Sequence, residues 1–234
     1  MNKKLKITLY VLAGIVIFYH VLKFSGILVV YSVPTTGSEP NIKRGSFIIA
    51  SNLITPKRGD FVTYRFNDPM LGESFMIHRL CGIENDTIHI VDGILYINGK
   101  NFDNGYNLKH SYVFSEEKFK SLGASIVGKD YFLIPDTNNE KMFLTFIEDK
   151  DARKLQLNGY RFLESKSKAN PQIKETYQQD WNKDHFGPYI VPKGKVFVLG
   201  DNRDNSSDSR SYGPIDKEAI VGALWKTLFV IDAD

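Results

Sequence analysis

Cysteine is nearly absent from this chain: Cys81 is the only one among 234 residues. A lone cysteine can form neither an intramolecular disulfide nor the cysteine pairs of a structural zinc site. Free cysteine is among the most buried residue types, so we interpret Cys81 as a small core residue. The sequence therefore argues against a disulfide-stapled fold and against a cysteine peptidase.

A strong charge of either sign is also missing. Lys and Arg number 30 against 27 Asp and Glu, a formal net charge of +3. No basic stripe alternates with aromatic residues, so we expect no nucleic-acid partner. The histidines and acidic residues show no metal-ligand spacing, and we therefore expect neither a metal nor an organic cofactor.

One long hydrophobic run is present, from Ile7 to Val33, interrupted mainly by His20 and Lys23. A helix of that length measures about 40 Å at about 1.5 Å per residue, and a hydrocarbon core is about 30 Å thick. The run therefore predicts a single membrane anchor over residues 1–33.

Three of the first six residues are lysine, which favours a cytoplasmic N-terminus. The remainder would then lie outside the cytoplasm, on the inner or plasma membrane. The alternative is a cleavable signal peptide, but the run is longer than a usual signal-peptide core, and residues 31–34 lack a pair of small residues three apart. We favour an uncleaved anchor.

Beyond Pro34 the sequence predicts mainly β structure. Asp92-Gly93 lies between two apolar runs, which is a strong hairpin signal, and Asn98-Gly99 marks another turn. Short apolar and β-branched runs bounded by turn residues are typical of strands. They cover Ser46–Ala50, Phe61–Phe66, Phe75–Ile83, Thr87–Val91, Ile94–Ile97, Val196–Leu199 and Ile220–Ile231.

The stretch 101–184 differs from its surroundings, since it is polar and rich in Lys, Asn, Gln and Tyr. Thr145 and Glu148 form a capping-box pattern before a predicted helix over Asp151–Leu157, and Ser115–Leu122 suits a second short helix. We expect a mostly surface insertion of mixed α/β structure.

The most informative segment runs from Gly200 to Arg210, a polar stretch directly after an apolar strand. Its acids, amides and arginines can satisfy one another in a partly buried loop. A calcium loop would need oxygen ligands at alternating positions, and the arginines argue against it. Composition alone leaves an ordinary solvated turn open.

This segment resembles the C-terminal box of the type I signal peptidases, the S26 family of serine peptidases. The resemblance is strong over roughly residues 34–98 and 185–226 and loose over the insertion. It is carried by Val198–Ser206, Asp208-Ser209-Arg210 and Gly213, by the flanks Phe186–Gly194 and Ile220–Gly222, and by two earlier boxes, Lys57–Val62 and His78–Ile83 leading to Asp86-Thr87-Ile88.

The resemblance implies a distorted antiparallel β-domain behind the membrane anchor. We therefore expect a peptidase domain over residues 34–234, in which the core comprises 34–100 and 185–234 and the insertion comprises 101–184.

The nucleophile box departs from the family pattern, which reads Ser-Met-x-Pro after a Ser/Thr-Gly pair. This chain has Thr36-Gly37-Ser38-Glu39-Pro40. Alignment on Thr36-Gly37-Ser38 makes Ser38 the nucleophile and Thr36 an oxyanion donor, with the methionine missing. Alignment on Pro40 puts Gly37 at the nucleophile position, where there is no hydroxyl. We favour Ser38, although a serine in this context is more often a turn or cap residue.

The second departure is the base. Bacterial members carry a lysine before the arginine of the second box, and eukaryotic-type members carry a histidine there; this chain has His78 before Arg79. Imidazole, with an ordinary pKa near 6.5, can act as a base at neutral pH without a large shift. Because imidazole is shorter than a lysine side chain, the Ser38 loop must approach it closely. We interpret the other histidines as structural or solvated: His20, His89, His110 and His185.

The resemblance also implies supporting roles. Ser206 would orient the base, Asp208 and Arg210 would form an ion pair, and the remaining arginines would partner the acids of the loop. The expected support set is Thr36, Arg79, Asp201, Asn202, Arg203, Ser206, Asp208 and Arg210.

The implied function is a membrane-bound serine endopeptidase that removes signal peptides from secreted preproteins, with the preprotein and the lipid bilayer as partners. The two departures leave alternatives open. One is a catalytically inactive accessory or binding module tethered to the membrane, and the other is a specialised processing peptidase with a single client.

Overall fold

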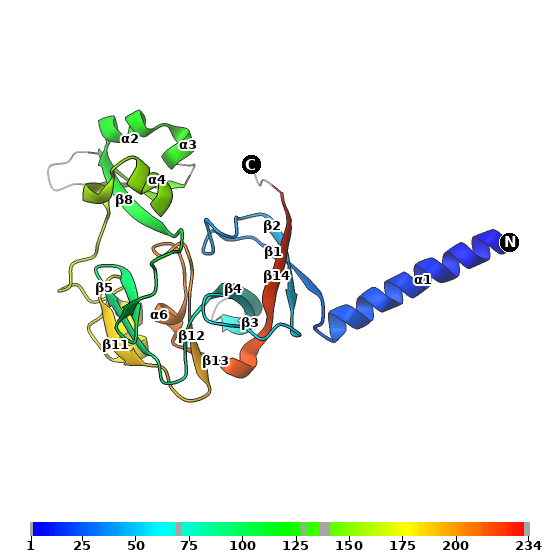
Figure 1. Cartoon of the computed structure of the whole chain (residues 1–234). Helices are drawn as coiled ribbons and strands as arrows, with labels where there is room; N and C mark the ends of the chain where they lie inside the picture. The colour runs from blue at the N-terminus through cyan, green and yellow to red at the C-terminus, as the bar shows by residue number, and fades with distance from the viewer. Residues whose placement is uncertain (1, 69–71, 128–129, 136–140, 232–234) are drawn as a thin grey trace.

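The computed structural model describes residues 2–68, 72–127, 130–135 and 141–231. A single N-terminal helix, α1 (Lys3–Phe24), projects away from a β-rich body (Figure 1). None of its residues is buried, and it is long and apolar enough to cross a membrane. The predicted class, mainly antiparallel β with one apolar N-terminal helix, is confirmed.

The prediction that the apolar run is helical up to Val33 is wrong. The helix ends at Phe24, and strand β1 (Val29–Val33) pairs with β2 (Ser46–Ser51). Val33 packs against Ile42 and Ile48, so the end of the run is buried in the domain core instead of lipid. The 22 helical residues still measure about 33 Å, enough for a bilayer core.

The main sheet is antiparallel and has the strand order β1-β2-β14-β3-β4-β12-β13. Its further members are β3 (Phe61–Asp68), β4 (Gly72–Ile83), β12 (Lys195–Leu199), β13 (Ile215–Asp216) and β14 (Ile220–Val230). On β4, strand β12 pairs with the last residues alone, from Arg79 to Ile83. Residues 72–78 of β4 therefore have a free edge on that side, as far as the described strands go.

A second sheet has the order β11-β5-β6-β7. Its strands are β5 (Thr87–Val91), β6 (Ile94–Ile97), β7 (Lys100–Asn101) and β11 (Phe186–Ile190). Asp92 and Gly93, with φ of 50° and 70°, make the predicted hairpin turn between β5 and β6. This sheet shares a core with the main one, in which Cys81 is fully buried as expected.

The stretch 101–184 holds the third sheet, β8-β10-β9, and α2–α4 gather with β8 at one end of the molecule (Figure 1). The strands are β8 (Lys109–Ser115), β9 (Tyr131–Pro135) and β10 (Lys141–Glu148). The helices are α2 (Glu116–Leu122), α3 (Ala124–Val127), α4 (Asp149–Lys154) and α5 (Pro171–Tyr177), with a 3₁₀ turn at Asn158–Tyr160. The chain's last helices are α6 (Ser209–Tyr212) and a 3₁₀ turn at Lys217–Ala219.

Two predictions within this stretch need correction. Thr145 caps no helix, because it lies inside β10 and its hydroxyl donates to the Val127 carbonyl (2.6 Å). The helix expected from Asp151 instead runs from Asp149 to Lys154. The stretch is also more than surface, since Ile173 of α5 packs into the core beneath the second sheet.

Candidate active site

His78 lies on β4, buried, with both ring nitrogens hydrogen-bonded to hydroxyl groups. Its Nδ1 is 2.8 Å from Tyr64 Oη and its Nε2 is 3.1 Å from Ser206 Oγ. The β3–β4 register pairs Val62 with His78, which places Tyr64 at the diagonal position on the same face. The predicted contact between Ser206 and the base is therefore present, and sequence analysis missed Tyr64.

The His78 ring is neutral at neutral pH. Burial lowers its pKa below 6.5, and the Asp208 carboxylate only partly opposes this effect. Burial also raises the pKa of the Tyr64 phenol far above its usual value of 10, so this partner is a neutral hydroxyl group. A neutral imidazole is the form that can take a proton from a nucleophile.

The loop after β12 is held by buried ion pairs; the Asp208–Arg210 pair was predicted, and Arg79 was expected to pair with an acid of the loop. Asp208 accepts from Arg210 Nε (2.9 Å) and Nη2 (2.8 Å) and from the Gly200 amide (3.0 Å). Burial alone would raise the pKa of Asp208, but Arg210, His78 and the amide together hold it below its usual value. Asp201 pairs with Arg79, whose Nε donates over 2.7 Å.

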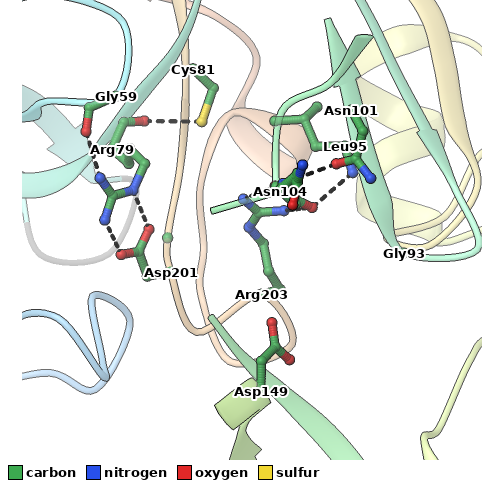
Figure 2. Close-up of polar contacts among 12 residues, drawn as sticks. Gly59, Arg79, Cys81, Gly93, Leu95, Asn101, Asn104, Asp149, Asp201 and Arg203 are labelled. Atoms are coloured by element: carbon green, nitrogen blue, oxygen red, sulfur yellow. Dashed lines mark hydrogen bonds and ion pairs between the residues drawn. The ribbon is translucent and has the colours of Figure 1, made fainter. Parts of the chain in front are cut away.

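Arg203 does not join these acids, contrary to expectation. Figure 2 shows the Arg79 guanidinium on Asp201, whereas Arg203 points toward the loop that carries Asn101 and Asn104. Its two terminal nitrogens each donate over 2.6 Å to Asp103. Arg79 already occupies both oxygens of Asp201. Arg203 therefore pairs with a residue about a hundred positions earlier in the chain, which no local sequence pattern predicts.

The segment of the predicted nucleophile lies against this loop. The Gly37 carbonyl accepts from the Asn202 amide (3.0 Å), and Asn202 Nδ2 donates to the Thr36 carbonyl (3.2 Å). Asn205 Nδ2 donates to Thr36 Oγ1 (2.9 Å), so the Thr36 hydroxyl keeps its own proton to donate.

Ser38 is buried, and its Oγ donates to the Ile77 carbonyl (2.8 Å). Among the hydrogen bonds of the described residues, none links Ser38 to His78. The structure thus brings Ser38 to the strand that carries His78. The Ser38 hydroxyl, however, faces the backbone of Ile77, the residue before His78.

A cavity of about 260 Å³ leads to this place along the sheet. Residues of β1, among them Tyr31 and Val33, line one side, and Phe75 and Ile77 of the free β4 edge line the other. Ile77 lies directly before His78 and contacts Ser38. The residue that lines this end of the cavity thus directly precedes His78 in β4, and His78 itself is not among the lining residues.

Of the other histidines, His110 is buried with its Nδ1 2.8 Å from Asp149, its Nε2 is buried without a hydrogen-bond partner among the described residues, and His89 is exposed. In the described part of the chain, no three His, Cys, Asp or Glu side chains gather in a way that could hold a metal ion.

Comparison with known proteins agrees with this arrangement. A model of the family described as signal peptidase, peptidase S26, matches residues 4–228. The chain belongs to the signal peptidase family. It is accordingly a serine endopeptidase of the signal peptidase I type.

Similar relatives include signal peptidase IB of Staphylococcus aureus strain Mu50, 28% identical over 217 residues, covering 89% of this chain and 81% of the relative. Signal peptidase I of Buchnera aphidicola subsp. Baizongia pistaciae is 27% identical over 217 residues, covering 83% and 67%. A signal peptidase I crystal structure from Enterococcus faecalis V583 is 22% identical, with a TM-score of 0.35, covering 74% of this chain and 98% of that one.

Proposed function

We propose that this protein is a membrane-anchored signal peptidase that cleaves signal peptides from secreted preproteins by a Ser–His mechanism with His78 as general base. The observation that carries the proposal is the neutral, buried imidazole hydrogen-bonded to a serine hydroxyl in a chain that the family model matches over residues 4–228. The relatives named above are signal peptidases, which supports preproteins as substrates.

The groove between β1 and the free edge of β4 suits an extended peptide. Both strands have unpaired backbone groups along this side, and a peptide strand can pair with such an edge. The lining combines apolar side chains with exposed polar groups, and the volume of about 260 Å³ suits small side chains before the cleavage site. A peptide lying there would present a carbonyl group next to His78.

The anchor supports action at a membrane surface. Helix α1 can span a bilayer, and its N-terminal lysines favour a cytoplasmic start, which puts the β-domain on the outer side. The exposed Leu53 and Trp225 lie beside Ile27 and Leu28, just after the helix. These side chains would meet the lipid interface where a preprotein emerges.

The attacking hydroxyl belongs to one of the two serines beside His78. Ser38 is the choice from the sequence, with the Thr36 hydroxyl and the Ser38 amide as oxyanion donors, each worth about 3–4 kcal/mol in such sites. Ser206 is the serine that touches the base. The proposed function depends on His78 and stands with either serine.

Neither alternative gains support from these observations. The relatives named above are signal peptidases, which does not favour an inactive accessory module. No feature of the described residues singles out one client, so we propose general preprotein cleavage.

The test is cleavage of a model preprotein, and of preproteins from the host, by the full chain purified in detergent. We expect cleavage by the wild type and a loss of at least about 10³-fold in His78→Ala, because loss of a catalytic base is that costly in serine peptidases. His89→Ala, on the exposed face of β5, is the matched control. A wild type that cleaves none of these preproteins would contradict the proposal.

A further inference from the structure

We propose that a cavity of about 490 Å³, between the second sheet and the β8–α4 part of the insertion, binds a small organic anion whose carboxylate or phosphate group is held by Arg153 and Arg161. None of Ser38, His78 and Ser206 lines this cavity. The inference goes beyond the proposed peptidase function and does not depend on it.

The walls of the cavity come from two parts of the chain. The β5–β6 turn and the loop after β7 contribute Gly93 and Asn104, and the insertion contributes residues of β8 and α4. Figure 2 draws Asn104 and Asp149, two members of this lining, together with Arg203. The volume of about 490 Å³ lies within the range of about 300–1,000 Å³ that is usual for small-molecule sites. The cavity therefore has room for an organic molecule.

Two arginines line the cavity without a carboxylate partner. Among the described residues, neither Arg153 nor Arg161 forms an ion pair. Arg161 Nη2 donates to the Gly93 carbonyl (3.2 Å), and Arg161 Nε is buried with no hydrogen-bond partner in the described part of the chain. A β-carbon on Gly93 would lie 2.6 Å from Arg161 Nη2, so glycine at this turn leaves room for the guanidinium. Because a guanidinium group matches the paired oxygens of a carboxylate or phosphate, these arginines indicate an anionic ligand.

The acids of the lining are engaged elsewhere. Asp103 accepts from both terminal nitrogens of Arg203, each over 2.6 Å, and Asp149 lies 2.8 Å from His110 Nδ1. These carboxylates therefore leave the two lining arginines without an ion-pair partner. A cationic ligand would be repelled by both guanidinium groups, whereas an anion would be attracted by both.

His110 contributes a second unsatisfied nitrogen to a residue of the lining. Burial alone would raise the pKa of Asp149, but the hydrogen bond and charge of His110 and the two lining arginines hold it below its usual value. An ionised carboxylate can only accept, so His110 Nδ1 carries a proton. Nε2 of the same ring is buried with no partner among the described residues. A nearby anion favours the protonated ring, in which Nε2 becomes a further donor.

The rest of the lining is apolar and determines the class of anion. Ile94, Leu108 and Leu163 line the cavity together with the polar groups. An inorganic phosphate ion would leave these side chains uncovered. A molecule that joins one carboxylate or phosphate group to a small apolar body would use both parts of the lining.

The test is isothermal titration calorimetry of the full chain in a non-ionic detergent at constant ionic strength. The probes are phenyl phosphate and phenylacetate, with inorganic phosphate and phenol as controls for the body and for the charged group. We expect saturable one-to-one binding of phenyl phosphate or phenylacetate, and the tighter of the two identifies the preferred charged group. Each control should bind at least about tenfold more weakly, since each lacks one half of the proposed contacts.

The variant that tests the site is Arg153→Gln, because Arg153 is exposed and its replacement leaves the Arg161 contact with Gly93 intact. It should weaken binding of the tighter probe at least about tenfold. Lys154→Gln is the matched control: it removes the same charge from the same helix end, is exposed, and lies outside the lining. This control should bind as the wild type does.

Hydrogen exchange of the wild type with the tighter probe locates the site without any variant. We expect slower exchange in residues 93–104 and 149–161. Absence of binding by both organic probes would mean that water alone fills the cavity and would overturn the inference. Equal weakening in Arg153→Gln and Lys154→Gln, inorganic phosphate that binds as tightly as phenyl phosphate, or slower exchange confined to other segments would each do the same.

Discussion

Two loops meet at His78, and they are held in different ways. The loop 200–210 carries four charged side chains that are at most 4% exposed, namely Asp201, Arg203, Asp208 and Arg210, each in an ion pair. The loop 34–41 is held mainly by backbone hydrogen bonds, such as Glu39 to Thr36 and Ile42 to Ser38. Among the described residues, the ion pair of this loop is Glu39 with Lys109, and it is less deeply buried.

This difference in how the two loops are held indicates which of them sets the geometry of the site. Buried charges held in ion pairs permit few alternative arrangements, because breaking a pair leaves a buried charge with neither a partner nor water. The loop with Ser206 is therefore fixed by one ion pair within the loop and by two more that tie it to Arg79 and Asp103. The loop with Ser38 adopts the shape that β4 and the loop 200–210 impose on it.

The largest expected effect is on stability, from Asp208→Ala. This change leaves the Arg210 guanidinium buried and unpaired, and removing one partner of a buried pair costs about 3–5 kcal/mol. Urea unfolding of the soluble part, followed in detergent, would measure the loss. The matched change in the other loop is Glu39→Gln, which keeps an acceptor for Lys109 and should cost about 1 kcal/mol. Equal decreases in the free energy of unfolding of the two variants would contradict the proposed difference between the two loops.

A second prediction concerns pH. His78 must be neutral to act as base, and burial lowers its pKa despite Asp208 and Asp201, with Arg210 adding to the decrease. The acid limb of kcat/KM should therefore lie below pH 6.5, and activity should fall about tenfold per unit below the pKa. An acid limb above pH 6.5 would mean that the two aspartates outweigh burial.

The same shift has a consequence for stability. The unfolded chain takes up a proton at His78 near pH 6.5, before the folded chain does. The free energy of unfolding should therefore decrease as the pH falls from about 6.5 toward the folded-state pKa. The decrease should be absent in His78→Ala, which supplies the control.

Among the changes at the histidine, the smaller effect is expected for Tyr64→Phe, which keeps the buried ring and removes the partner of His78 Nδ1. Loss of about 1.4 kcal/mol of hydrogen bonding corresponds to about a tenfold decrease in kcat. Because the imidazolium loses an acceptor, the acid limb should also move to lower pH. A shift to higher pH would show instead that the phenol donates to Nδ1.

Many strands of the two core sheets could be predicted from the sequence, and the Asp208–Arg210 pair of the C-terminal loop was implied by the family resemblance. Alternating apolar residues and turns such as Asp92-Gly93 act locally, and Asp208 lies two residues from Arg210. Long-range choices could not be predicted. The pairing of Arg203 with Asp103, the contact of Tyr64 with His78 and the rotation of Ser38 toward Ile77 depend on which distant segments pack together.

The junction between α1 and β1 has a mechanical consequence. Asn52 clamps the turn after the helix, since its side chain donates to the Ser25 carbonyl and its amide to the Gly26 carbonyl. Strand β1 is thus both the continuation of the anchor and one wall of the groove. Strand β4, the other wall, is separated from α1 by two intervening strands of the chain beyond β1. We expect a bilayer that changes the tilt of α1 to pull on β1 and not on β4, which would make the width of the groove depend on the thickness of the surrounding lipid.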